Sequence, residues 1–260
     1  MTRTRRLLCA LALFAAPLAQ AGPIQVSALP VGGSSILGGY SMVDFLDPRT
    51  QPEPALSATS VDGDVVTLTG KNGVALPTSG PFGPLMRVGD RTNAGSGTNA
   101  DPDERWWDGG DDGYYYADFG FNWIELVLPE NTVAFSLTVD SNTSASAWMV
   151  ATDAQGMAVD TQGSVYDAAS ITQPSDVPFS ISLGNSKPAR SFGFHVDNSP
   201  AAGSCNTLSK VLIDPTRAWG IGDFSIHVAD NACTPVPAPA GLPLAFGLLL
   251  LTGIGRRRRG

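Results

Sequence analysis

The densest group of side chains that could do chemistry is an acidic segment near the middle of the chain. Six carboxylates fall within twelve positions, interleaved with glycines: Asp101, Asp103, Glu104, Asp108, Asp111 and Asp112. Carboxylate and carbonyl oxygens are the ligands that Ca²⁺ prefers, six to eight at a time. The spacing follows neither the EF-hand loop nor a nonapeptide repeat. We expect a solvated turn in which Asp and Gly serve backbone geometry. The alternative is a Ca²⁺ site, with no other cofactor, on Asp101, Asp103, Asp108, Asp111 and Asp112.

Aromatic residues accompany the acidic segment: Trp106, Trp107, Tyr114, Tyr115 and Tyr116. Exposed aromatic rings stack against the C–H faces of sugars, so these five residues form a candidate glycan-binding surface. The simpler interpretation is a strand that turns the rings of Tyr114, Tyr116 and one tryptophan inward. Exposure of the rings would distinguish the two.

Motifs for catalysis are missing from the sequence. His195 and His227 lie within apolar, strand-like runs outside any metal or triad motif, which favours structural roles. Phosphate-binding loops, nucleophile elbows and zinc signatures are not present. A pair of carboxylates suffices for glycoside hydrolysis, but among 24 acidic residues some pair always exists. We expect no enzymatic activity and keep a secreted carboxylate-pair hydrolase as an alternative.

Short strands are the elements that must position these residues. β-Branched or alternating runs bounded by Gly, Pro, Asn or Asp recur at residues 64–69, 123–128, 133–139, 146–151, 177–183, 191–196, 208–213 and 223–228. Amphipathic helical periods do not separate them. The pattern predicts an all-β fold, a β-sandwich or jelly-roll-like single domain.

Turns and faces follow from the same runs. Residues 129–131 (Pro-Glu-Asn) and 153–156 (Asp-Ala-Gln-Gly) are typical of turns. Between residues 133 and 139, apolar residues alternate with small or polar ones, which predicts one face in the core and the other in water. Residues 70–113 are rich in Gly, Pro, Asn and Asp, and we expect a long irregular, functional or mobile loop there.

Charge separates the body of the chain from its ends. Seven of the 16 basic residues lie in the two terminal segments and none of the 24 acidic ones do, so residues 22–234 carry 9 − 24 = −15. A surface this acidic argues against nucleic acid and anionic lipid headgroups as partners. It favours solubility, cations or a neutral polymer.

Cysteines in the body number two, Cys205 and Cys233. An even count in an exported protein predicts one disulfide between them. In the chain-entropy model such a bridge contributes roughly 3 to 4 kcal/mol.

The N-terminus has the composition of a signal peptide. Three arginines within residues 1–6 precede an apolar run at 7–18 and a small-x-small site at 19–21. We expect residues 1–21 to form a signal helix that is removed, so that the exported domain spans 22–234.

The C-terminal segment, residues 235–260, combines three features in order. A Pro-rich hinge contains Val236, Pro237, Ala238 and Pro239, an apolar stretch follows at 242–254, and the chain closes with Arg256, Arg257, Arg258 and Arg259. Thirteen helical residues cover about 20 Å against a hydrocarbon core of about 30 Å. The arginines should stay on the cytoplasmic side and leave the body outside. A plain tail anchor is the alternative to a sorting signal.

This arrangement resembles the PEP-CTERM sorting signal of Gram-negative bacteria, with Ala238 where that family usually has Glu. The resemblance implies an exosortase-type membrane protease as transient partner and transient anchoring in the inner membrane through a short apolar helix at 242–254. It also implies a place at the cell surface or in the secreted matrix, in association with exopolysaccharide and biofilm. We expect a non-enzymatic surface or matrix protein, with a Ca²⁺-dependent carbohydrate-binding module as the first alternative.

Overall fold

The computed structural model describes residues 24–47, 57–76, 86–88, 114–117, 123–141, 146–173, 176–177, 181–182, 189–198, 206–215 and 219–230. Within these ranges the fold is all-β, as predicted: its strands are joined by turns and by the short 3-10 segments η2 (Lys71–Gly73) and η4 (Ala168–Ser170). No helix in this part of the chain has the length and apolar composition needed to span a bilayer.

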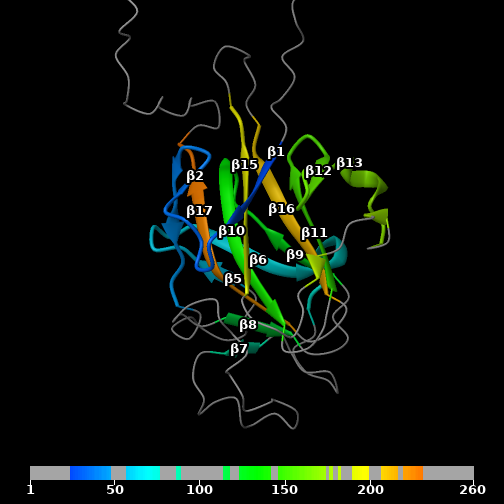
Figure 1. The fold of residues 1–260 in the computed structure, drawn as a ribbon, viewed down its shortest axis with the longest axis horizontal. Coiled ribbons are helices and arrows are strands. Elements are labelled where there is room, and N and C mark those ends of the chain that lie inside the picture. Colours follow the sequence, from blue (N-terminus) through cyan, green and yellow to red (C-terminus); the bar gives the residue numbers. More distant parts are fainter. Residues whose placement is uncertain are drawn as a thin grey trace, which may run out of the picture.

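One sheet has seven antiparallel strands. Its order is β1 (Ile24–Leu29), β15 (Arg190–Val196), β10 (Thr132–Ser141), β17 (Trp219–Val228), β8 (Tyr114–Ala117) and β7 (Met86–Val88), with β4 (Val43–Asp44) also paired to β17. The long strands β10 and β17 lie side by side near its middle (Figure 1).

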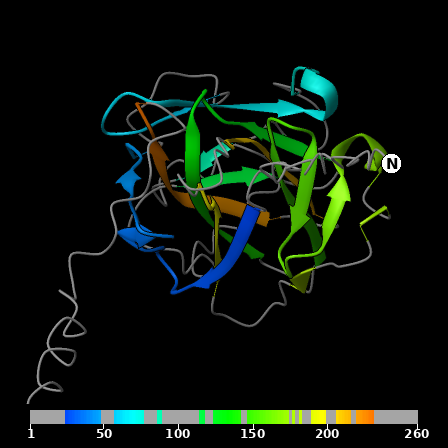
Figure 2. The same ribbon diagram turned by 90° about the horizontal axis from the view of Figure 1, so that it is seen from above.

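The other sheet has eight antiparallel strands. Its order is β13 (Val165–Asp167), β12 (Met157–Asp160), β11 (Ser146–Asp153), β16 (Leu208–Pro215), β9 (Ile124–Val127), β6 (Val65–Gly70) and β5 (Ser57–Thr59), with β14 (Ile181–Ser182) paired to β11. The chain also forms a small hairpin of β2 (Ile36–Leu37) and β3 (Tyr40–Ser41). Figure 2, seen from above, separates β17 and β10 from the strands of β11, β12 and β13.

Both sheets contribute to one hydrophobic core. Phe135 and Phe194 of the first sheet and Leu126 and Ile213 of the second are almost fully buried in the same cluster. Full burial of such a side chain contributes about 1.5 to 3 kcal/mol. Three phenylalanine rings reinforce the first sheet's side of the core: Phe45, Phe135 and Phe224, with centroids 5.7 to 6.5 Å apart.

The alternation in β10 places its apolar residues in the core, as predicted, but the prediction of a wet opposite face is wrong. Ser136 and Thr138 are buried, and their hydroxyls pair with Ser225 and Ser191 at 2.7 and 2.6 Å. Small side chains on this face let the β2–β3 hairpin and the turn before it lie directly over the sheet. At this cover a Cβ added to Gly193 would come within 2.7 Å of the Leu37 side chain.

Two successive turns of the eight-stranded sheet share one sequence pattern, Asp-x-Gln-Gly. In the predicted turn at 153–156, Asp153 Oδ1 accepts the amides of Gln155 and Met157, and β11 leads into β12. In the next turn Asp160 Oδ1 accepts the amides of Gln162 and Ser164 in the same way. Each aspartate therefore satisfies its own turn, which fixes the register of the hairpin.

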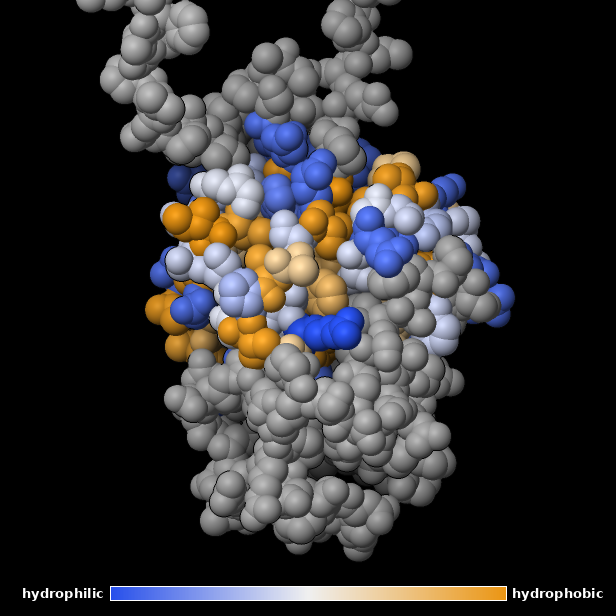
Figure 3. Space-filling view, in the orientation of Figure 1, coloured by the Kyte–Doolittle hydropathy of each residue, from blue (hydrophilic) through white to orange (hydrophobic). Residues whose placement is uncertain are grey.

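Exposed hydrophobic side chains lie on the segment that covers the first sheet. They are Val31 and Ile36, and Leu46 follows just after β4. Figure 3 shows hydrophobic residues gathered along one side of the molecule. The expected signal helix, the C-terminal segment from Val236 to Arg259 and the expected Cys205–Cys233 pair lie outside the described residues.

Candidate functional site

Most residues singled out from the sequence lie outside the described part of the chain. This holds for the candidate Ca²⁺ ligands between Asp101 and Asp112 and for Trp106 and Trp107. The backbone of Tyr114, Tyr115 and Tyr116 forms β8, which pairs with β7 and β17. A backbone strand is thus present at the tyrosines, and the inward direction of their rings stays a prediction.

A cleft of about 350 Å³ opens on the outer face of the eight-stranded sheet. Alternation defines this face: Leu126 and Ile213 point into the main core, so Glu125 and Leu212 point away from it. Its walls are completed by a second apolar cluster that includes Trp123 and Ile171. The residues that line the cleft come from β9, β11, β16, η2, η4 and the first Asp-x-Gln-Gly turn.

Glu125 of β9 forms the floor of the cleft. It is only 3% exposed although it is a carboxylate. Its Oε1 accepts the backbone N–H of Asn72 at 3.0 Å and the indole N–H of Trp123 at 3.3 Å, while Oε2 accepts the Lys210 ammonium at 2.9 Å. These three donors replace the water that burial removes, since an unpaired buried charge is strongly unfavourable.

The turn η2 brings two of these partners to Glu125. Asn72 adopts a left-handed conformation (φ 57°), which asparagine tolerates better than most residues, and this aims its backbone N–H at the carboxylate. The preceding Lys71 places its Nζ 5.4 Å from the centroid of the Trp123 ring, a cation–π contact. Trp123 itself has φ 85°, a strained value for a bulky residue.

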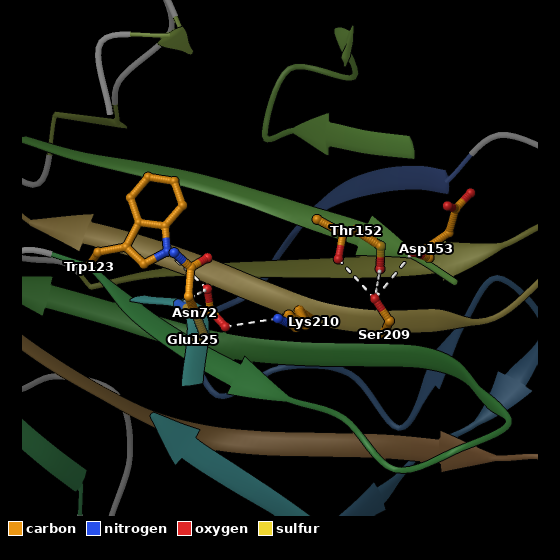
Figure 4. A network of polar contacts seen from close by, with 7 residues as sticks. All are labelled: Asn72, Trp123, Glu125, Thr152, Asp153, Ser209 and Lys210. Atoms are coloured by element: carbon orange, nitrogen blue, oxygen red, sulfur yellow. Dashed lines mark hydrogen bonds and ion pairs between the residues drawn. The ribbon is translucent and has the colours of Figure 1, made fainter. Parts of the chain in front are cut away.

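Hydroxyl groups occupy the other end of the cleft (Figure 4). Thr152 Oγ1 and Ser209 Oγ lie 2.9 Å apart on neighbouring strands. Asp153, beside them, accepts the side-chain amide of Asn206 at 2.8 Å in addition to its two turn amides. At this end of the cleft, the hydroxyl, carboxylate and amide groups are therefore already hydrogen-bonded to one another.

A further buried carboxylate, Asp214, lies on β16 two residues beyond Leu212 and on the same face of the sheet. Asp214 is 6% exposed. Burial raises the pKa of Asp214 from 3.8 to about 6, and the positive charge of Lys71 acts in the opposite direction. The charge of Asp214 therefore changes in the mildly acidic range.

Sequence reasoning missed the cleft, although two signals point to it. Glu125 interrupts an otherwise apolar strand, and the chain has only three lysines, Lys71, Lys187 and Lys210, of which two line the cleft. Within the described ranges, no group of three or more His, Cys, Asp or Glu residues is arranged to hold a metal ion. The polar groups that line the cleft are carboxylates, ammonium groups, an amide and hydroxyls.

Comparison with models of known protein families, with curated proteins and with solved structures found no match to this chain.

Proposed function

We propose that this protein is an exported, non-enzymatic component of the cell surface or matrix whose β domain binds a polysaccharide in the outer-sheet cleft. The observation that carries the proposal is the cleft itself, with its charged floor at Glu125 and Lys210 beside the apolar Leu212 and Ile171. A sugar ring offers both polar edges and C–H faces. The volume of about 350 Å³ falls in the range of ligand sites and suits one or two sugar units.

The finer architecture in this proposal is a β-sandwich of the jelly-roll kind over residues 22–234. Its support is the shared core and the way consecutive strands change sheets. β9, β10 and β11 belong alternately to the eight-stranded, seven-stranded and eight-stranded sheets, and β15, β16 and β17 alternate in the same manner.

Binding is favoured over hydrolysis by the state of the two carboxylates in the cleft. A general acid or base needs a carboxyl oxygen that can exchange a proton with the substrate. Glu125 and Asp153 each accept from three protein donors. We therefore propose the hydrolase reading only as the weaker alternative.

The binding proposal predicts that Ala154→Trp abolishes glycan binding. Ala154 is an exposed turn residue on the wall of the cleft, so a large ring there fills the cleft without disturbing the core. Isothermal titration of the purified full-length protein against neutral and acidic oligosaccharides should show at least a tenfold loss, about 1.4 kcal/mol. Exposed Gln162→Trp, on the next turn, is the matched control and should bind as the natural protein does. Equal binding by all three proteins would overturn the proposed site.

Export and sorting are proposed from the two terminal segments. The mature protein isolated from its native host should begin at Gly22 and lack everything after the hinge at Val236–Pro239, since the short span and arginines suit an exosortase-type protease. Mass spectrometry of the intact protein measures both ends. A surface form that retains Arg256 to Arg259 would instead mean permanent anchoring.

A further inference from the structure

The hydrogen-bonding capacity of the cleft is unevenly used. Glu125 and Asp153 accept three hydrogen bonds each, out of about four that a carboxylate can take. An ammonium group has three N–H donors. Lys210 uses one of them on Glu125 and its side chain is 39% exposed, so the others point to solvent or to a ligand.

Lys71 has still more donor capacity to offer. Its contact in the described part of the chain is the face of the Trp123 ring, which engages the charge but accepts no ordinary hydrogen bond. The cleft is therefore rich in unused donors and poor in unused acceptors. A ligand that satisfies it must bring acceptor oxygens.

Charge distribution points the same way. The body of the chain carries −15, yet two of its three lysines line this one cleft. Both lie at the end formed by Trp123 and Glu125 (Figure 4 shows Lys210 there, joined to Glu125). The two carboxylates that line the cleft, Glu125 and Asp153, each already accept three protein hydrogen bonds, so the two ammonium groups are the lining charges with capacity left for a ligand.

Aromatic stacking does not supply the recognition at this end. Trp123 is 5% exposed, and its face is covered by Lys71 while its N–H is used by Glu125. A neutral sugar would thus find neither an open ring nor free acceptors. Charge-assisted hydrogen bonds from ammonium to an anionic oxygen are shorter and about twice as strong as neutral ones.

We propose that the cleft is specific for a sugar unit that carries an anionic group, held through its charged oxygens by Lys71 and Lys210. The inference rests on the proposed polysaccharide binding and deepens it. A uronic acid carboxylate and a sugar sulfate share this chemistry.

The test is titration calorimetry at pH 7 with matched trisaccharides, using the full-length protein. Homotrimers of galacturonate, glucuronate and mannuronate form the carboxylated arm, and each is paired with the neutral trimer of the same linkage. A sulfated galactose trimer forms the sulfated arm. We expect at least one acidic trimer to bind tenfold or more tightly than its neutral partner, and the affinity to fall as salt is raised. The better of the carboxylated and sulfated arms identifies the source of the anion.

Variants then assign the preference to the lysines. Lys71→Gln should lose the acidic trimer at least tenfold and leave the neutral one within twofold, while Lys71→Arg should stay within threefold of the natural protein. Arg190→Gln removes the same charge from an exposed position on the other sheet and should change nothing.

Two failures are distinguishable in this design. If acidic and neutral trimers bind alike in every pair, or Lys71→Gln and Arg190→Gln behave alike, the anionic preference is overturned while the binding function stands. If no trimer binds, or Ala154→Trp leaves binding intact, the proposed function itself fails.

Discussion

Gly38→Ala is expected to lower the free energy of unfolding by about 3 kcal/mol. Gly38 lies in the turn of the β2–β3 hairpin with φ +60°, and an added Cβ would lie 2.6 Å from Nε2 of His195 and closer still to Cδ2. A left-handed conformation costs an L-residue about 1 to 2 kcal/mol, and overpacking against the half-buried His195 ring should cost about 1 to 3 kcal/mol more. Urea denaturation followed by circular dichroism measures the loss.

Gly163→Ala is the matched control for this variant. Gly163 has φ +83°, and nothing lies within 4 Å of an added Cβ there. It therefore suffers the backbone strain without the clash and should lose only about 1 kcal/mol. If Gly38→Ala and Gly163→Ala lost the same stability, the hairpin would not press on His195 and the close cover of the first sheet would be disproved.

Asp214→Asn is expected to stabilise the protein in neutral solution and to have little effect near pH 4. Because burial raises the folded-state pKa of Asp214 from 3.8 to about 6, the folded protein holds this proton more tightly than the unfolded chain. The stability that wild-type protein has at pH 4 is then lost as pH rises toward 6 and beyond. Each pKa unit corresponds to about 1.4 kcal/mol, so the variant should gain about 2 to 3 kcal/mol at pH 8.

Thermal or urea unfolding of both proteins at pH 4, 5, 6, 7 and 8 tests this dependence. Asp167→Asn is a suitable control because Asp167 is exposed, at the end of β13. A difference between Asp214→Asn and the natural protein that stays constant from pH 4 to pH 8 would contradict the raised pKa.

The sequence predicted the long strands well and the short ones poorly. Seven of the eight predicted runs lie on β6, β9, β10, β11, β15, β16 and β17, and in the eighth, residues 177–183, the described strand is β14 at Ile181–Ser182. The strands β2 to β5, β7, β12 and β13 have two to four residues and were not predicted, and the six-residue β1 was missed as well. Such short strands exist because a neighbour pairs with them, and local sequence carries little of that information.

The sequence also did not predict that both faces of the first sheet are buried. Ser136 and Thr138 have the composition of a solvated face, and what buries them is a segment about a hundred residues earlier in the chain. The cleft was missed for the same reason. Lys71, Glu125 and Lys210 are far apart in the sequence, and only the pairing of β6, β9 and β16 brings them to one place. The acidic and aromatic residues between 101 and 116, in contrast, are neighbours in the sequence, so their clustering is visible without a structure.

If the protein is held by its C-terminal end, as the proposed sorting route implies, the position of β17 has a mechanical consequence. Among the described strands β17 is the last in the chain, and it lies inside its sheet between β10 on one side and β8 and β4 on the other. Tension between an anchored tail and a polymer in the cleft would pull along this strand. The hydrogen bonds between β17 and its neighbours are perpendicular to the strand and therefore to the pulling force. Such a force would load all of these bonds at once in shear, so that they could not break one after another. Under the sorting proposal, the described strand nearest the C-terminal segment is thereby placed where the domain could bear force.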